Sequence, residues 1–227
     1  MSNLIVEAIN VTKIYNLGKP NEVTAVREAS LQIKEGSLVV LKGPSGSGKT
    51  TLLSMIGCQT KPTSGEVIIL GKRISKLPEK FMNLHKRRHI GFIFQQFQLI
   101  AGMSVLNNIE LPLMPDGISP KGREKRADQL LEQFNLAHRR RFKVSSLSGG
   151  EQQRVAIARA LINNAGILLA DEPSAHLDSK LTMDFLDHIK QLKLSGHTIL
   201  IASHDSIIYK HREVDQVFEM RNGEITS

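Results

Sequence analysis

Short apolar runs alternate with amphipathic stretches along most of the chain. Four runs are almost continuously apolar, at 38–42, 90–94, 167–171 and 198–203. Runs of this length without polar alternation are typical of strands that are buried on both faces, as in a parallel sheet covered by helices. The pattern therefore predicts an α/β domain with a mainly parallel core sheet.

A second set of segments alternates between apolar and polar residues and ends in turn signals such as Glu35-Gly36 and Asn222-Gly223. These segments are LIVEAINVTKIY (4–15), ASLQIK (29–34), GEVIIL (65–70) and VDQVFEMRNGEIT (214–226). Alternation favours antiparallel strands with one open face. We expect them to flank the main sheet and to form a separate small sheet.

The pattern becomes helical between Gln98 and Ser146, where Pro112, Pro115 and Pro120 interrupt it. The stretch GREKRADQLLEQFNL has the spacing of an amphipathic helix. We therefore expect one domain over 1–227, in which 98–146 form an inserted helical lobe and 1–97 and 147–227 form the core with its antiparallel β lobe.

Composition is consistent with a globular domain, because 41% of the 227 residues are hydrophobic. The single cysteine, Cys58, excludes an internal disulfide, and its apolar neighbourhood predicts a small buried residue. No apolar run reaches the length of about 18 residues that suggests a membrane span, and the N-terminus lacks the features of a signal peptide. We expect a cytoplasmic location.

The net charge is +8, with basic clusters at 86–88, 121–126 and 138–143. Such clusters can face nucleic acid or anionic lipid. Solvated helix faces are the favoured interpretation, because aromatic residues are only 4% of the chain and no stacking platform is marked.

The motif GPSGSGKT follows an apolar strand and precedes TLLSMIG, which is the context that a phosphate-binding loop requires. Its glycines let backbone N–H groups curl around phosphates at a helix N-terminus. Lys49 is expected to contact the β- and γ-phosphates, and Thr50 to place its hydroxyl on Mg²⁺. The predicted nucleotide-binding residues here are Gly43, Pro44, Ser45, Gly46, Ser47, Gly48, Lys49, Thr50 and Thr51.

Two acids end the apolar strand of GILLADEP. Charge at such a position is costly unless a cation or a reaction uses it. Asp171 is predicted to serve Mg²⁺ through a metal-bound water. Since side chains alternate along a strand, Glu172 is expected on the opposite side, toward the attacking water, as the general base.

A second glycine-rich turn, LSGGEQ, opens the predicted helix EQQRVAIARALI. Its N–H groups and the Ser148 hydroxyl could bind another anion. One nucleotide does not need two such loops. A head-to-tail dimer with twofold symmetry resolves this, because the second loop of one subunit then covers the γ-phosphate held by its partner.

Together these motifs resemble the ATP-binding cassette (ABC) family over nearly the whole chain, and LSGGEQ resembles its signature motif. The resemblance implies the P-loop ABC ATPase fold, ATP and Mg²⁺ as ligands, and an active ATPase. It also implies roles for Tyr15 on adenine, Gln95 at Mg²⁺ and the attacking water, and His204 on the γ-phosphate. The residues that would complete the partner's site are Ser148, Gly149, Gly150, Glu151 and Asp178.

Two departures from close relatives are mild. Ser174-Ala175-His176 replaces the more usual Thr-Gly-Asn, and Asn164-Ala165-Gly166 lacks a proline that often stands there. Neither touches the predicted chemistry. His176 is expected near the dimer interface, where it is interpreted as a neutral substitution or as a residue that tunes the site.

The stretch IGFIFQQFQLIAGMSVLNNIELPLM resembles the subgroup that serves lipoprotein release, macrolide and peptide export, and cell-division permeases. This implies a homodimer in the ATP-bound state and a separate membrane permease with few transmembrane segments and a large extracytoplasmic domain. The cassette would sit on the inner face of the membrane through that permease, and no nucleic acid is expected.

The Gln95 loop and the helical lobe are expected to form a groove for a cytoplasmic helix of the permease. Phe97, Leu99, Ile100 and Met103 either contact that helix or pack inside the lobe. Two other functions stay open: a cell-division cassette that signals without transport, and a soluble nucleic-acid-linked ATPase.

Overall fold

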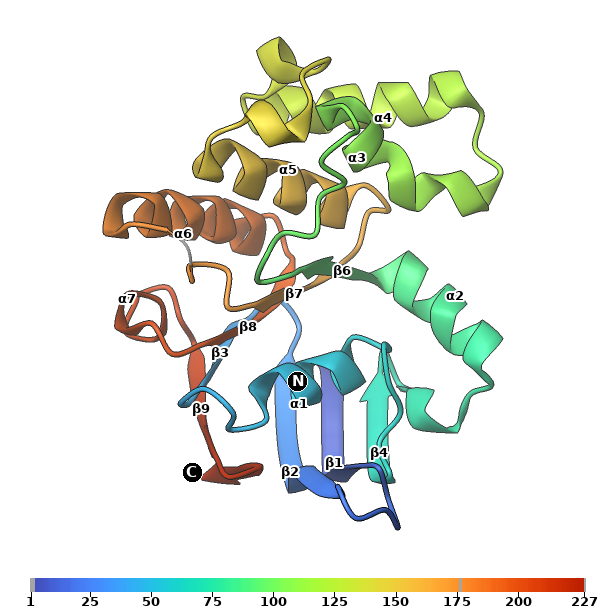
Figure 1. The fold of residues 1–227 in the computed structure, drawn as a ribbon, viewed down its shortest axis with the longest axis vertical. Coiled ribbons are helices and arrows are strands. Elements are labelled where there is room, and N and C mark those ends of the chain that lie inside the picture. The colour runs from blue at the N-terminus through green and yellow to red at the C-terminus, as the bar shows by residue number, and fades with distance from the viewer. Residues whose placement is uncertain (1–2, 176, 227) are drawn as a thin grey trace.

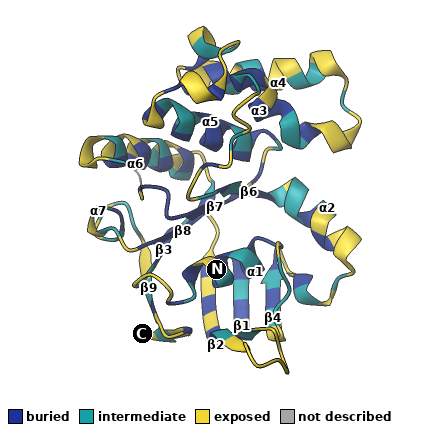
Figure 2. Cartoon of the chain, in the orientation of Figure 1, coloured by how far each residue is buried: buried dark blue, intermediate teal, exposed yellow. Residues whose placement is uncertain are grey.

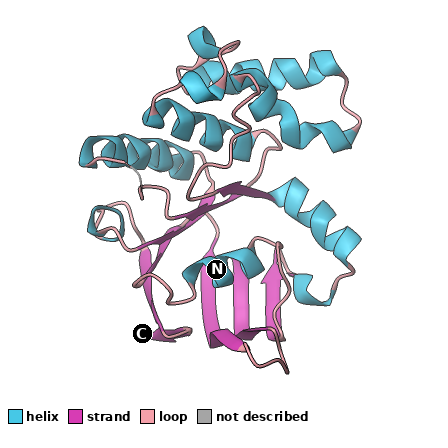
Figure 3. Ribbon diagram, in the orientation of Figure 1, coloured by secondary structure: helices cyan, strands magenta, loops and turns pink. Residues whose placement is uncertain are grey.

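Two β-sheets and two groups of helices build the molecule (Figure 1). The computed structural model describes residues 3–175 and 177–226. The strands form two sheets (Figure 3). The larger sheet has the order β10-β9-β3-β8-β7-β6, and the smaller has the order β2 (Val23–Lys34), β1 (Leu4–Tyr15), β4 (Ser64–Ile69) and β5 (Lys72–Arg73). In the larger sheet all neighbouring pairs are parallel except β9 and β10. Its strands are β3 (Leu38–Lys42), β6 (Ile90–Ile93), β7 (Ile167–Asp171), β8 (Thr198–Ser203), β9 (Gln216–Arg221) and β10 (Glu224–Thr226).

The central strands separate two hydrophobic cores. Along β3, Leu38 and Val40 face one core, whereas Val39 and Leu41 face the other. Because successive side chains of a strand point to opposite faces, a strand covered on both sides must be apolar throughout. The central strands are accordingly buried along their length (Figure 2). The predicted parallel sheet is confirmed, and β3, β7 and β8 have the predicted bounds.

The smaller sheet is antiparallel and covers one face of helix α1 (Lys49–Ile56) (Figure 1). Buried side chains of α1, including Leu53 and Ile56, fill the space between the two sheets. Cys58 lies in the same core, and burial raises the pKa of its thiol to about 12, as fits a packing residue. The strands of this sheet are β1 (Leu4–Tyr15), β2 (Val23–Lys34), β4 (Ser64–Ile69) and β5 (Lys72–Arg73).

The prediction for the last segment, 214–226, was wrong in its placement. Strand β9 is not part of the small sheet; it pairs in parallel with β3, with Val217 beside Val40. Its alternation arises because one face is open, so that Val217 is 39% exposed whereas Met220 is fully buried. An open face gives the same pattern in a parallel strand near the edge as in an antiparallel one.

The helices lie mainly on the face of the large sheet opposite α1 (Figure 1). Segment 98–146 is helical, as its pattern predicted, and Pro120 occupies the first turn of α4. The helices are α2 (Glu79–His89), α3 (Val105–Glu110), α4 (Pro120–Gln133), α5 (Gly149–Leu161), α6 (Ser179–Leu194) and α7 (Ser206–Tyr209). The 3-10 turns are η1 (Ile74–Lys76), η2 (Leu111–Asp116), η3 (Ala137–Arg139) and η4 (Val144–Ser146). Within 3–175 and 177–226, no helix has the length and apolar character needed to cross a membrane.

Helix α5 packs directly against the backbone of β6. A Cβ atom at Gly91 would lie 2.2 Å from the carbonyl oxygen of Ala160, so only glycine fits there. The close approach fixes α5 on the sheet at its C-terminal end.

Candidate active site

The phosphate loop lies between β3 and α1 and is held by both sheets. Gly48 has φ +100°, and a Cβ atom there would lie 2.3 Å from the carbonyl oxygen of Ala25 in β2. A Cβ atom at Gly43 would lie 2.2 Å from the carbonyl oxygen of Met220 in β9. Only glycines allow strands from the two sheets to approach the loop so closely.

Lys49 is buried and its ammonium group is directed into the loop. Nζ donates hydrogen bonds to the carbonyl oxygens of Gly43 at 2.8 Å and Pro44 at 3.0 Å. It also forms an ion pair with Oε1 of Glu172 at 3.1 Å. The loop therefore holds a positive charge next to the first turn of α1, where an anion is further favoured by the helix dipole.

Thr50 and Asp171 offer oxygen ligands on one side of the loop. The Thr50 hydroxyl donates to Oδ1 of Asp171 at 3.0 Å. Burial raises the pKa of Asp171, although the hydrogen bond from Thr50 opposes this. Gln95 and Thr50 border a common hollow with Asp171. Hydroxyl, amide and carboxylate oxygens suit Mg²⁺, so these residues fit the expected cation.

The protein alone offers few ligands to such a cation. In the described ranges no three His, Cys, Asp or Glu side chains come together as a metal cluster. A magnesium ion here would share its coordination with substrate phosphates and water, which is how Mg²⁺ is commonly held in nucleotide-binding sites.

Glu172 turns toward Lys49 and His204. Its φ is +43°, a left-handed conformation that is uncommon outside glycine. Oε2 lies 2.9 Å from Nδ1 of His204. Strand β7 ends at Asp171, and Glu172 contacts Lys49 and His204, whereas the Asp171 carboxylate accepts from Thr50.

These side chains border one cavity of about 490 Å³. Lys49 and Thr50 reach it from the start of α1, and Gln95, Glu172 and His204 reach it from the segments that follow β6, β7 and β8. The other lining residues are Val23, Thr24, Ala25, Ser45, Gly46, Ser47, Gly48, Thr51, Asn222 and Gly223. A pocket where backbone N–H groups, a buried lysine and a carboxylate–histidine pair converge can bind a phosphate chain and act on a bound water.

Tyr15 lies just outside this cavity. It pairs across the sheet with Val23, which lines the cavity, and it is 41% exposed. The Lys13 ammonium lies 5.4 Å from its ring centroid. The ring is therefore available for stacking next to the pocket.

The second glycine-rich turn does not line this cavity. Ser148 caps α5: its hydroxyl accepts from the Glu151 N–H at 3.3 Å, and the Glu151 carboxylate accepts from the Ser148 N–H at 2.9 Å. Arg139 pairs with the same carboxylate at 2.7 Å. Glu151 thus holds the turn in shape, and the first-turn N–H groups at Gly149 and Gly150 are left available to an anion.

The loop before α6 packs beside this turn. Added Cβ atoms at Gly149 and Gly150 would meet Leu177 at 3.8 Å and Leu181 at 2.8 Å. Asp178 caps α6 by accepting from the Leu181 N–H at 2.8 Å. The structure therefore gathers the signature turn and the Asp178 loop into a second cluster. The neighbouring His176 lies outside the described residues.

Arg159 is a residue of the site that the sequence interpretation missed. From α5 it donates to the carbonyl oxygens of Phe97 and, at 2.6 Å, Gln98. Both of these residues have positive φ, +57° and +47°. The arginine thereby stabilises a strained backbone two residues beyond Gln95. An arginine within the apolar stretch AIARALI was the available signal.

Comparison with known proteins decides the family. A model of the ABC transporter family matches residues 26–175, more than half of the 227 residues. The chain belongs to the ABC transporter family. It is 43% identical over 221 residues to the uncharacterized ABC transporter ATP-binding protein MJ1508 of Methanocaldococcus jannaschii, covering 97% of each chain.

Two further relatives are similar to this chain over nearly its whole length. The macrolide export ATP-binding/permease protein MacB of Pectobacterium atrosepticum is 38% identical over 99% of this chain, which spans 34% of MacB. A dimeric, post-hydrolysis structure of the ATP-binding cassette MJ0796 bound to ADP and Pi superposes with a TM-score of 0.88 at 41% identity, covering 98% of this chain and 97% of that one. The predicted family, the ABC ATPase fold and the ATPase activity are confirmed.

The ABC cassette also carries a groove of about 910 Å³ between α2 and the helical segment. Asn83 and Lys86 line one side, Pro112 and Pro115 the other. The four contacts proposed from sequence do not line it: Phe97 is buried in the core, Leu99 packs against that core, Met103 is half-buried and Ile100 is 42% exposed. For Phe97 and Leu99 the alternative of internal packing holds, since the positive φ values at Phe97 and Gln98 turn the chain inward.

Proposed function

We propose that two copies of this ABC ATPase close head to tail over two ATP molecules and thereby drive a separate membrane permease. One observation carries the proposal: Lys49, Glu172 and His204 border the cavity, whereas the signature turn forms a second cluster elsewhere on the same chain. A twofold dimer brings the turn of one copy onto the cavity of the other. The dimeric MJ0796 structure supports this arrangement.

Each site residue then has a role. The loop N–H groups and Lys49 bind the β- and γ-phosphates. Thr50, Asp171 and Gln95 would hold Mg²⁺, which supplies charge neutralisation on the phosphates when it is bound. Tyr15 stacks on the adenine.

Glu172 acts as the general base that takes a proton from the attacking water, and His204 orients its carboxylate and contacts the γ-phosphate. The 2.9 Å contact between these two side chains supports the pairing. The partner's site is completed by the Ser148 hydroxyl, the N–H groups of Gly149 and Gly150, and the Asp178 loop, with Glu151 holding the turn.

ATP stabilises the closed dimer because each nucleotide contacts both copies, so closure is linked to nucleotide binding. Hydrolysis removes that link and the dimer reopens. The groove beside α2 transmits the movement by holding a short cytoplasmic helix of the permease. The volume and the mixed polar and apolar lining of this groove support a helix as its occupant.

The subgroup is that of lipoprotein release and macrolide export, with a permease of few transmembrane segments and a large extracytoplasmic domain. MacB relatives support this, because this chain corresponds to about a third of proteins named as both ATP-binding and permease. The cassette then lies on the inner face of the membrane through the permease.

Affinity purification of the tagged chain from gently solubilised membranes tests this function. A stoichiometric membrane protein should co-purify, and Asn83→Arg, which fills the groove from an exposed position, should remove it. Asn107→Arg is the matched control, because Asn107 is exposed on α3 and does not line the groove. Recovery without any membrane protein would contradict the proposal, and equal loss in both variants would contradict the groove assignment.

A further inference from the structure

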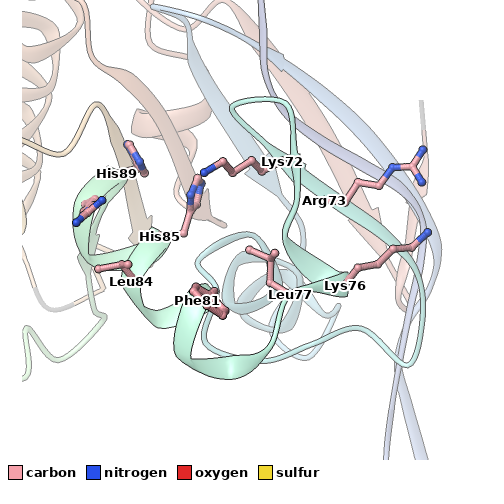
Figure 4. A pocket seen from close by; sticks show the side chains of 9 residues that line it. Lys72, Arg73, Lys76, Leu77, Phe81, Leu84, His85 and His89 are labelled. Atoms are coloured by element: carbon pink, nitrogen blue, oxygen red, sulfur yellow. The ribbon is translucent and has the colours of Figure 1, made fainter.

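Another hollow, of about 530 Å³, lies between β5, η1 and the opposite face of α2. Leu77, Phe81 and Leu84 form its apolar part, and Lys72, His85 and His89 add basic groups (Figure 4). Arg88 also lines it. The permease groove uses other residues of α2, namely Asn83, Lys86 and Arg87. Helix α2 therefore separates two hollows with no lining residue in common.

Basic groups of several residues converge in this hollow. The rings of His85 and His89 lie 4.5 Å apart, and the Lys72 ammonium is directed toward the ring of His85 (Figure 4). Burial and the charge of Lys72 lower the pKa of both histidines. Within 3–175 and 177–226, no carboxylate lies within 4.0 Å of the charged ends of Lys72 or Arg88.

His85 gives an independent sign of a ligand. Its side chain is 94% buried, since 6% of it is exposed, yet Nε2 has no hydrogen-bond partner in the described chain. A buried polar atom without a partner costs free energy. The neighbouring Arg73 and Lys76 differ, because both pair with Glu66, at 3.4 Å and 2.5 Å. Unsatisfied polarity is thus confined to the side of the hollow where Lys72 and His85 meet.

The apolar residues of the hollow indicate which class of anionic ligand can bind there. Phe81 is 55% exposed at the rim, and Leu77 and Leu84 continue the apolar wall. A bound peptide would bring amide groups that this wall cannot satisfy, whereas an acyl chain needs no polar partner. An exposed aromatic next to lysine and arginine is also the usual composition of a surface that meets lipid head groups.

We propose that this hollow binds an anionic phospholipid. The phosphate lies among Lys72, His85 and Arg88, and the first carbons of an acyl chain lie over Phe81 and Leu77. The inference rests on the hollow alone and is independent of the groove and of the proposed dimer. It places this edge of the cassette, beside the permease groove, against the lipid surface.

Vesicle sedimentation tests the charged part. The full chain should bind vesicles of phosphatidylglycerol and phosphatidylcholine and should bind pure phosphatidylcholine weakly. Lys72→Gln with Arg88→Gln should lower the affinity by about tenfold or more, since each cation near an anionic surface contributes about fivefold. Lys121→Gln with Arg126→Gln removes the same charge from exposed positions on α4 and should have a smaller effect. Equal losses in the two double variants would overturn the proposal.

Histidine signals in NMR test the site itself. Soluble dihexanoyl-phosphatidylglycerol should shift the His85 and His89 ring signals in a saturable way, with His85→Gln providing the assignment. Phe81→Ser should weaken this binding severalfold without altering charge. If glycerol phosphate produces the same shifts at the same concentration, the hollow binds a bare phosphate and the lipid proposal fails; absence of shifts with either ligand also overturns it. Unchanged ATP turnover in all variants confirms that they are folded.

Discussion

The phosphate loop and the signature turn are both glycine-rich segments at the start of a helix, but different kinds of contact hold them. In the cavity, the ammonium of Lys49 and the carboxylate of Glu172 are brought together from separate elements, 3.1 Å apart. At the turn, Ser148 and Glu151 satisfy each other across three residues. The cavity is assembled by the whole fold, whereas the turn is a local structure on one helix.

The difference shows what each region requires. The cavity holds charges that are costly to bury and that are balanced only by mutual contacts. The turn is held by its own capping pair and by Arg139, and it does not line the cavity that Lys49 and Glu172 border. In the proposed dimer, the cavity binds ATP within a single copy, and the turn serves the site of the second copy.

Removing the ammonium from the cavity should have the largest effect. Lys49→Ala should abolish ATP binding and turnover, because the phosphates lose their buried cation while Asp171 and Glu172 stay. Binding of a fluorescent ATP analogue and phosphate release measure this. Lys34→Ala, at an exposed strand end, is the control. If Lys49→Ala retained turnover, the assignment of 43–51 as the phosphate-binding loop would be wrong.

Removing only the base should separate binding from chemistry. Glu172→Gln should keep ATP binding but lower turnover by about 10²- to 10⁴-fold, the usual contribution of a general base. With hydrolysis suppressed, an ATP-dependent dimer should accumulate on a sizing column. A variant that hydrolyses normally and stays monomeric with ATP would refute the composite site.

Blocking the turn should inactivate the partner's site and spare its own. Ser148→Arg should abolish turnover and leave ATP binding within about twofold in the isolated chain, because the turn lies outside the cavity. Ser148→Ala loses the same cap, worth about 1 kcal/mol, without the bulk. Comparing the two separates loss of the cap from obstruction. Loss of ATP binding in the monomer would show that the turn acts in cis.

Removing Arg159, which joins α5 to the loop after Gln95, should have a smaller effect than the changes in the cavity or the turn. Arg159→Ala removes two hydrogen bonds from a charged donor and should lower the free energy of unfolding by about 2 kcal/mol. Turnover should fall more than ATP affinity, since the strained backbone beyond Gln95 is released. Urea unfolding and steady-state kinetics check both effects; an unaltered kcat would mean that the arginine serves stability alone.

A pH effect distant from both regions should be the smallest. The pKa of His85 falls to about 4 through burial and the charges of His89 and Lys72. Since the unfolded value is about 6.5, protons below that pH bind the unfolded chain preferentially. This stability is full above pH 6.5 and is lost as the pH falls toward 4. His85→Gln should reduce the decline in urea midpoint between pH 7 and 5 by an amount worth about 1 kcal/mol; an identical decline in both proteins would contradict it.

The buried strands were the easiest part to predict from sequence. Leu38–Lys42, Ile167–Asp171 and Thr198–Ser203 are mainly apolar on both faces, and this pattern is typical of a strand covered on both sides. Helix α2 was not predicted, because only Met82 and His85 of its residues are buried and the remainder gives little periodicity. Strand β9 was misplaced, because alternation reports an open face and not the direction of the neighbouring strand.

The site was predictable in its members and less so in its geometry. Residue type and order pointed to Lys49, Asp171 and Glu172. The direction of Glu172 depends on a φ of +43°, which no local sequence rule gives for a glutamate. The clamp from Arg159 depends on contacts between residues about sixty positions apart, which only the folded chain brings together.

Helix α5 connects the signature turn to the part of the core that contacts the loop after Gln95. Its 13 residues span about 20 Å. The helix begins at Gly149 in the signature turn and ends next to Gly91, where its backbone packs directly against the sheet. Near that end Arg159 donates hydrogen bonds to the carbonyl oxygens of the strained loop after Gln95. In the proposed dimer, a partner that contacts the turn therefore contacts the same helix that holds the loop after Gln95.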